Sequence, residues 1–534
     1  MPCSHSLVPI PLIPIPLTTL PAPLLPQDKV FAGFKNSDRL GFDNGSGVPR
    51  EVERLSLENS VSICVNRWFP WRLFQNPLGA EVTRLRSLGN RRLLTSSPTV
   101  LKAPSCAWIL LLALTLVADV ALGGESLIAP AVQALAAGDF GGRAVTQAQL
   151  EQYLPAPKPH PFAQREHLVL QLNGERKPAK FPAQMQWISQ SWNGDNAQMP
   201  YLVCLPEKDR LLMLVEAGQP IHSAFITSDD HGQTWSARHW LSVDADGKPN
   251  GVGLGLTHLG GGRLLAFPED LKSLWTSADY GQTWQGSPAR EPAAERYAWD
   301  PLLVLRASKG RAENLAQGIW APTGVAWGSP DGFYSQASFR TSADAGRTWS
   351  DAIKVPQWLG VNEVSLLVAR NGDWLAACRT DYPRRFARHQ FDHYGGLAVS
   401  TSKDQGRTWS DLQPLYEWGR HHPSLVLLPR GKILMTYVVR LGYPNDAQGF
   451  PQFGVEAVIS SDHGQTWDLA HRYILATWSG NLKDERSWFC SVQSTTTIRL
   501  RDGTLLTAFG TGFNNQPDAK RCKMDVALVK WRLK

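Results

Sequence analysis

Ser228-Asp229-Asp230-His231-Gly232-Gln233-Thr234-Trp235 is the first of five copies of one pattern, Ser-x-Asp-x-Gly-x-Thr-Trp, in a chain of 534 residues. The other copies occupy residues 277–284, 342–349, 402–409 and 460–467. Self-similarity at a period of this size is the sequence signature of a repeat architecture. The five copies therefore predict a fold built from repeated units.

Each octapeptide has the composition of a tight turn that ends one strand and starts the next. The Ser and Asp side chains accept hydrogen bonds from backbone N–H groups in such turns. The Gly supplies a residue with positive φ, and the Trp ring is large enough to pack between neighbouring units. The pattern therefore predicts structure rather than chemistry on a substrate.

The pattern is the Asp-box, and over roughly residues 180–534 the chain resembles the sialidase superfamily of β-propellers. The resemblance implies an all-β fold, a six-bladed β-propeller of four-stranded antiparallel blades, preceded by an irregular N-terminal extension. The five boxes mark five blades. Strands at Gln493–Leu500, Thr504–Phe509 and Val526–Trp531 form a sixth, and the segment near Met185–Ser191 is expected to supply its outer strand, which closes the ring.

The region before the repeats divides into three parts by composition. Residues 1–100 are rich in Pro and Arg, and we interpret them as a disordered or spurious extension. Residues 101–124 combine Lys102, an apolar run and a small-residue end, which predicts a signal peptide and a secreted or periplasmic protein. Residues 125–180 are expected to be a linker with a short helix near Val145–Tyr153, and residues 181–534 form the propeller.

Charge and cysteine content exclude several classes of partner. The net charge is +7, but residues 1–102 contain twelve Lys or Arg against seven Asp or Glu, so the repeat region is only mildly basic. We therefore expect no nucleic-acid partner, and no membrane association after removal of the signal. The seven Cys form no Cys-x-x-Cys pair. No metal or other cofactor is expected, and the protein is expected to be a monomer that acts on a carbohydrate.

The inner strands of a propeller converge on its axis, so polar residues that open an inner strand or close the second strand are the candidates for chemistry. Charged side chains are costly to bury without partners, which favours a functional role for so dense a set. At this register the chain has Gln198, Tyr201, Glu269, Asp270, Trp299, Asp300, Glu363, Arg379, Asp381, Arg420, His421, His422, Tyr437, Arg440, Gln493 and Ser494.

We assign roles within this set by chemical type. Glu363 and Asp300 open adjacent inner strands, so they are the predicted pair of carboxyl groups for general acid and base catalysis. His422 and Tyr437 are the predicted proton carriers. Trp299, Trp320 and Trp358 are candidates for stacking on sugar rings. The predicted substrate-binding residues are Arg379, Asp381, Arg420, Arg440, Gln198 and Trp299.

The segment Asn362–Thr380 carries the closest resemblance to sialidases. In that family a Glu, here Glu363, polarises a nucleophilic Tyr, and an Arg, here Arg379, is one of three that bind the substrate carboxylate. Elsewhere the chain departs from the family: Gln198 and Gln452 stand where the other two Arg are expected. No Tyr opens the last blade, and no Asp precedes the first Asp-box in register. The resemblance thus implies a sialidase-like exo-glycosidase for terminal sugars, with a sugar that need not be sialic acid.

Two alternatives stay open. A polysaccharide lyase on the same propeller would use His421 or His422 with Tyr437 as base and acid, and Arg379 to neutralise a uronate. A non-catalytic carbohydrate-binding propeller would keep the fold without the chemistry.

Overall fold

A computed structural model describes residues 165–174, 176–188, 196–288, 296–308, 311–326, 329–381, 392–484, 487, 494–512 and 524–533. The chain divides into two units, residues 1–103 and 104–534, and every described residue belongs to the second. The N-terminal extension, the signal peptide and the helix near Val145–Tyr153 lie outside the described residues and stay predictions.

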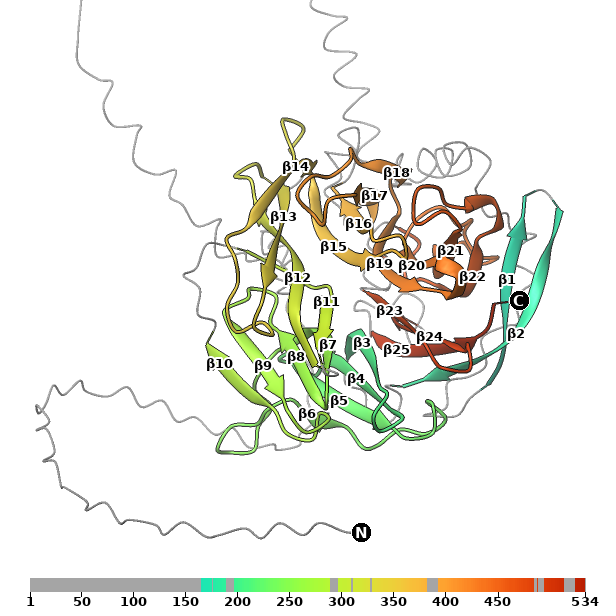
Figure 1. Cartoon of the computed structure of the whole chain (residues 1–534). Helices are drawn as coiled ribbons and strands as arrows, with labels where there is room; N and C mark the ends of the chain where they lie inside the picture. Colours follow the sequence, from blue (N-terminus) through green and yellow to red (C-terminus); the bar gives the residue numbers. More distant parts are fainter. Residues whose placement is uncertain are drawn as a thin grey trace, which may run out of the picture. The chain divides into compact units, whose positions relative to one another are not determined.

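Four of the sheets are separate antiparallel blades of four strands, as predicted (Figure 1). The first contains β3 (Ala197–Leu205), β4 (Arg210–Ala217), β5 (His222–Ser228) and β6 (His239–Trp240). The second contains β7 (Leu254–Gly260), β8 (Arg263–Phe267), β9 (Ser273–Ser277) and β10 (Gln285–Pro288). The third contains β11 (Leu303–Ser308), β12 (Arg311–Pro322), β13 (Ser335–Ser342) and β14 (Ile353–Leu359). The fourth contains β15 (Val361–Val368), β16 (Trp374–Thr380), β17 (Gly396–Ser402) and β18 (Gln413–Tyr416).

The remaining strands form one sheet of nine, in the order β19-β20-β21-β22-β1-β2-β25-β24-β23. One part contains β19 (Arg420–Leu427), β20 (Ile433–Val439), β21 (Gln452–Ser460) and β22 (Tyr473–Ser479). The other contains β23 (Thr495–Arg499), β24 (Leu505–Thr511) and β25 (Asp525–Trp531). Six separate blades are therefore not seen, because the last two sets of strands are merged. Short 3-10 helices lie at Asp392–Tyr394, Pro429–Gly431 and Leu469–His471.

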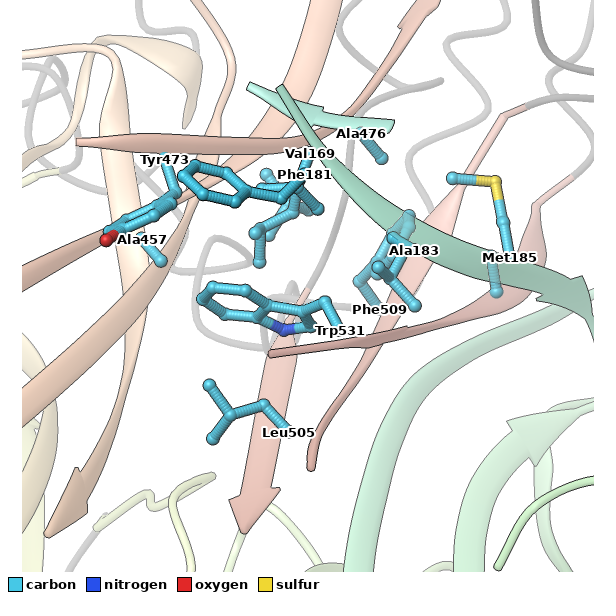
Figure 2. Close-up of a cluster of buried hydrophobic side chains, with 14 of the residues drawn as sticks. Val169, Phe181, Ala183, Met185, Ala457, Tyr473, Ala476, Leu505, Phe509 and Trp531 are labelled. Atoms are coloured by element: carbon cyan, nitrogen blue, oxygen red, sulfur yellow. The ribbon is translucent and has the colours of Figure 1, made fainter. Parts of the chain in front are cut away.

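A hairpin of β1 (Arg165–Asn173) and β2 (Arg176–Trp187) merges the two sets. β1 pairs with β22, and Gln184–Trp187 of β2 pair with the last strand, β25. The prediction that the segment near Met185 supplies an outer strand is confirmed. The expected linker, however, ends earlier than predicted, since residues 165–180 belong to this hairpin. Figure 2 shows Phe181 beside Tyr473, with Met185 near Ala183 at the other side of the same buried cluster.

The second strands of the blades are buried on both faces. β20 has the sequence Ile-Leu-Met-Thr-Tyr-Val-Val, and all seven residues are buried. β24 is equally buried, and β4 and β16 are buried except at one end. A strand in this position packs against the blade on either side, so both faces select apolar residues. This packing holds the inner strands at fixed positions around the axis.

The Asp-box turns have the predicted hydrogen bonds between their Ser and Asp side chains and backbone N–H groups. In the fourth box the Ser402 hydroxyl accepts the Gly406 amide at 2.8 Å and donates to Asp404, also at 2.8 Å. Asp404 in turn accepts the amide and hydroxyl of Thr408 at 2.8 and 2.6 Å. The other four boxes repeat these bonds. All five boxes are therefore structural turns.

Candidate functional site

A cavity of about 290 Å³ lies where the inner strands meet. Its walls come from β3, β7, β15, β19 and β23 and from residues 299–304, at the start of the third blade. Each inner strand is an edge strand of its sheet, or of its part of the merged sheet. The volume is near the lower end of the range for small-molecule sites, about 300–1,000 Å³. Of the predicted site residues, Glu363, Asp300, His422 and Trp299 line it.

Glu363 and Arg379 form an ion pair across the β15–β16 hairpin. The two residues are register partners, and Arg379 Nη1 lies 2.6 Å from Glu363 Oε1. Both side chains are almost completely buried. Burial alone would raise the pKa of Glu363, but Arg379 and then His422 outweigh it and hold the pKa below its ordinary value. Glu363 is therefore ionised at neutral pH.

His422 joins this pair from the next blade. Its Nδ1 lies 2.6 Å from Glu363 Oε2, and its Nε2 lies 3.4 Å from Arg440 Nη2. Burial lowers the pKa of His422 to about 4 although Glu363 opposes the shift, so the imidazole is neutral at pH 7. A carboxylate and a guanidinium fix the tautomer, because the carboxylate only accepts and the guanidinium only donates. Nδ1 therefore carries the proton, and the Nε2 lone pair is directed to Arg440.

Asp300 is the second carboxyl group of the cavity, and its protonation state is opposite to that of Glu363. Its Oδ2 accepts the backbone N–H of Val364 at 3.0 Å, so Asp300 lies beside the residue that follows Glu363. Burial, and then the charge of Glu363, raise the pKa of Asp300 to about 8. Because Oδ2 is bonded to an amide, Oδ1 is the oxygen that carries the proton. The predicted adjacency of the third and fourth inner strands is confirmed.

Irregularities in the inner strands direct these side chains. The register of β15 against β16 shifts between Val361 and Glu363, and that of β19 against β20 shifts between His421 and Ser424. His422 lies within the second shift with φ of 53°. Positive φ is uncommon outside Gly and marks positions that the surrounding structure holds in place. A bulge of this kind re-aims a side chain, here the His422 imidazole toward Glu363.

A second group of acids lies near the first and second blades. Gln198 Nε2 donates to Glu216 Oε2 at 3.3 Å, and both are buried. Burial and then Glu269 raise the pKa of Glu216 well above its ordinary value. Burial, and then Asp270 and Glu363, raise the pKa of Glu269 to about 8. Gln198 was predicted to bind substrate, but it donates its hydrogen bond to Glu216 and is not among the residues that line the cavity.

Tyr437 and Arg420 lie in another buried cluster, away from the cavity wall. The Tyr437 and Tyr416 hydroxyls are 2.9 Å apart. Arg420 Nε is 3.5 Å from Glu456 Oε2, and Arg472 Nε reaches the same oxygen at 3.2 Å. Burial would raise the pKa of Glu456, but Arg472 and Arg420 hold it below its ordinary value. The assignments of Tyr437 as proton carrier and Arg420 as ligand stay predictions without support from the cavity.

Asp381 and two of the Trp residues have structural contacts. Asp381 accepts the Tyr334 amide at 2.9 Å and the Ser335 hydroxyl at 2.9 Å, which joins the third and fourth blades. The Trp320 and Trp358 side chains are fully buried, so neither is placed to stack on a sugar. Only Trp299 of the three Trp candidates reaches the cavity. Arg379 and Arg440 lie directly behind it, through their contacts with Glu363 and His422.

A set of hydroxyl groups that sequence patterns indicate only weakly completes the wall: Thr257, Ser365, Ser424, Ser494, Thr495, Thr496 and Thr497. Only Ser494 belongs to the predicted register. The others lie deeper along the inner strands, where a small hydroxyl residue is common in any strand. Tyr201 also lines the cavity. It belongs to the set of residues predicted to lie near the axis, but no role was predicted for it.

The described residues contain neither a cluster of metal ligands nor a helix long enough to span a membrane. No three His, Cys, Asp or Glu side chains in the described ranges are grouped so as to bind a metal ion. In the same part of the chain, no helix has the length and apolar character to cross a bilayer.

Comparison with known families agrees with this architecture. Residues 319–531 match the BNR repeat-like domain, and residues 226–237 match the BNR/Asp-box repeat. The chain is a β-propeller with BNR/Asp-box repeats. The Asp-box propeller that the octapeptides indicated is thereby confirmed. No curated protein matched the sequence.

Several solved structures are similar to this propeller at low identity. A protein of unknown function from Dyadobacter fermentans is 16% identical, with a TM-score of 0.47 over 64% of this chain and 96% of that one. A Hadza microbial sialidase is 16% identical, with a TM-score of 0.43 over 63% of this chain and 66% of that one. An alpha-L-arabinanase from Penicillium chrysogenum is also 16% identical, with a TM-score of 0.38 over 62% and 93%.

Proposed function

We propose that this BNR-repeat propeller is a glycoside hydrolase that removes terminal sugars from glycans or polysaccharides. One observation carries the proposal: the cavity holds two carboxyl groups on adjacent inner strands, one ionised and one protonated at neutral pH. Glycoside hydrolysis uses such a pair, since one group must give a proton to the leaving oxygen while the other acts as base or nucleophile. The Asp-box resemblance supports the same class.

Each group suits one of the two roles. Asp300 carries a proton on Oδ1 and would donate it to the glycosidic oxygen. Glu363 is negatively charged, and Arg379 and His422 hold each of its oxygens in place. Pre-oriented partners of this kind keep a carboxylate fixed for attack or for activation of water. The cavity volume of about 290 Å³ suits a single sugar ring, so we propose an exo-acting enzyme.

The contacts of His422 favour a hydrolase over a lyase. A lyase needs a free base to remove a proton beside a uronate carboxylate, and an Arg to neutralise that carboxylate. Here the Nε2 lone pair of His422 is directed to Arg440, and Arg379 is bonded to Glu363. His422 and Arg379 are thus engaged within the protein, and neither His421 nor Tyr437 is among the described residues that line the cavity.

Activity screening tests the class. Purified protein is incubated with a panel of aryl glycosides, oligosaccharides and uronate polysaccharides, and released sugars are quantified. A hydrolase releases a reducing sugar without new ultraviolet absorbance, whereas a lyase produces an unsaturated, absorbing product. Sugar binding without turnover would leave the carbohydrate-binding propeller as the function.

We also propose that the protein is exported, secreted or periplasmic, and acts as a monomer. The support is the apolar segment at residues 101–124, which has the form of a signal peptide. N-terminal sequencing of the protein from the native host checks this. A mature protein that retains residues 1–90 contradicts it.

A further inference from the structure

Tyr201 is the one Tyr among the described residues that line the cavity, and it is almost completely buried. It follows a bulge in β3, where the register against β4 shifts between Gln198 and Tyr201. Met199 inside that bulge has φ of 52°. The same device turns His422 toward Glu363 in the fifth inner strand. The first inner strand therefore brings Tyr201 to the cavity wall as the fifth brings His422.

Other hydroxyl groups of the wall fasten one inner strand to the next. The Thr257 hydroxyl accepts the Leu302 amide at 2.8 Å, which joins the second blade to the third. The Thr496 hydroxyl donates to the Pro200 carbonyl at 2.9 Å, which joins β23 to β3. The Tyr201 hydroxyl is buried, and among the described residues no group accepts its proton; the Gly255 backbone N–H, a donor, is the backbone group that acts on its oxygen. A buried polar atom of this kind is costly unless a ligand satisfies it.

The surroundings of the phenol define what it can bind. Burial, and then the carboxyl groups of Asp300, Glu216 and Glu363, raise the pKa of Tyr201 well above its ordinary value, and only the Gly255 backbone opposes them. The phenol is therefore neutral and carries a proton to donate. Glu363, the one of these three carboxyl groups that is ionised at neutral pH, would repel an anion at this place. A neutral oxygen, such as a sugar hydroxyl, is the acceptor that fits.

We infer that Tyr201 donates a hydrogen bond to an uncharged hydroxyl of the sugar in the cavity and selects for sugars that carry this hydroxyl. The inference rests on the proposed function and adds a specificity residue to it. It places an uncharged part of the sugar toward the first blade, on the side of Tyr201.

The test compares wild type and Tyr201→Phe on the best glycoside from the panel and on its monodeoxy analogues. In the wild type, removal of the contacted hydroxyl should lower kcat/KM by about two- to tenfold, the range for one neutral hydrogen bond. In Tyr201→Phe that penalty should vanish, while the penalties for the other hydroxyls remain. Tyr473→Phe is the matched control, since Tyr473 is buried in the core cluster beside Trp531 and not in the cavity wall.

The outcomes distinguish a failure of the inference about Tyr201 from a failure of the proposed glycoside hydrolase function. If the wild type is active and Tyr201→Phe shows the same analogue pattern, the inference about Tyr201 is overturned and the proposed function stands. If no glycoside is cleaved, the same comparison is made by calorimetric titration with monosaccharides and their deoxy forms. A wild-type protein that neither cleaves nor binds any of these sugars overturns both.

Discussion

The Nδ1 atom of His422 lies 2.6 Å from Oε2 of Glu363, although the two residues belong to different blades. With Arg379 on the other oxygen, the carboxylate is held from its own hairpin and from the next blade. The position of the ionised group therefore depends on how the fourth and fifth blades pack together.

Replacement of Glu363 by Gln should abolish activity and lower stability. The change removes the charge that balances Arg379, and breaking a buried ion pair costs about 3–5 kcal/mol. We expect kcat/KM to fall by at least about 10²-fold, together with a lower midpoint of denaturant unfolding. Turnover of the best glycoside and urea unfolding measure the two effects.

Glu456→Gln is the matched control, because Glu456 is equally buried with Arg420 and Arg472 but lies away from the cavity wall. It should lose stability and keep its kcat/KM. If it loses activity while folded, the cluster that includes Tyr437 belongs to the site after all.

Asp300→Asn should keep the fold and lose the proton donor. Asn resembles the protonated carboxyl group in shape and charge, so the free energy of unfolding should change little at low pH, where Asp300 is protonated in both the folded and the unfolded state. Near pH 7 the variant should be the more stable protein, because its folding takes up no proton at this position. Activity should fall for substrates with poor leaving groups and recover for aryl glycosides whose leaving group needs no proton. Equal losses for both kinds of substrate would contradict an acid role for Asp300.

The pH dependence of activity and stability should follow from the titration of Asp300. Because Asp300 must be protonated and its pKa is about 8, activity should decline as pH rises through about 8. The folded state also binds this proton between the ordinary value of 3.8 and about 8, so stability should fall as pH rises through that window. Both effects should disappear in Asp300→Asn. Glu269→Gln is the control and should retain the decline in activity, although Glu269 has a pKa of about 8 too.

Gly255→Ala should disturb the cavity from the second blade. Gly255 has φ of +60°, and an added Cβ would lie 2.2 Å from the Phe267 ring and 3.0 Å from the Asp300 carbonyl. Overpacking of this kind typically costs about 1–3 kcal/mol, and the shift of Asp300 should lower kcat. Gly372→Ala is the control: it has φ of +92° with nothing within 4 Å, so it should lose stability only. Thermal melts and turnover distinguish the two variants.

Ser402→Ala tests the structural role of the Asp-box. It removes the acceptor of the Gly406 amide and a donor to Asp404. The loss should be about 1 kcal/mol of unfolding free energy, measured by urea denaturation, with kcat/KM unchanged. A variant with normal stability and reduced activity would argue against a purely structural box.

The sequence was sufficient for the features that follow from periodicity. The repeated boxes located the turns, and the alternating strands between them placed Glu363 opposite Arg379. Asp300 was expected beside the fourth inner strand, and its bond to Val364 agrees. The predicted outer strand near Met185 is also confirmed, since Met185 of β2 pairs with Val529 of β25. Such features depend on local pattern and on the closure of the ring.

The sequence was insufficient where a bulge or a neighbouring blade decides the direction of a side chain. The contact of His422 with Glu363 depends on a residue with positive φ, which no periodicity predicts. Tyr437 belonged to the same register but is bonded to Tyr416. Arg420 is likewise directed to Glu456, because a buried acid there needs a cation.

The pairing of β2 with β25 has a consequence for synthesis. Trp187 pairs with Ala527, so the two strands leave the ribosome well over half a chain apart. Both edges of the β1–β2 hairpin stay without their partner strands while the intervening blades are made, since β1 pairs with β22 and β2 pairs with β25. Long-range pairing of this kind is slow, and open strand edges invite association with other chains. During translation, the hairpin is therefore the part of the propeller that most needs protection by a chaperone.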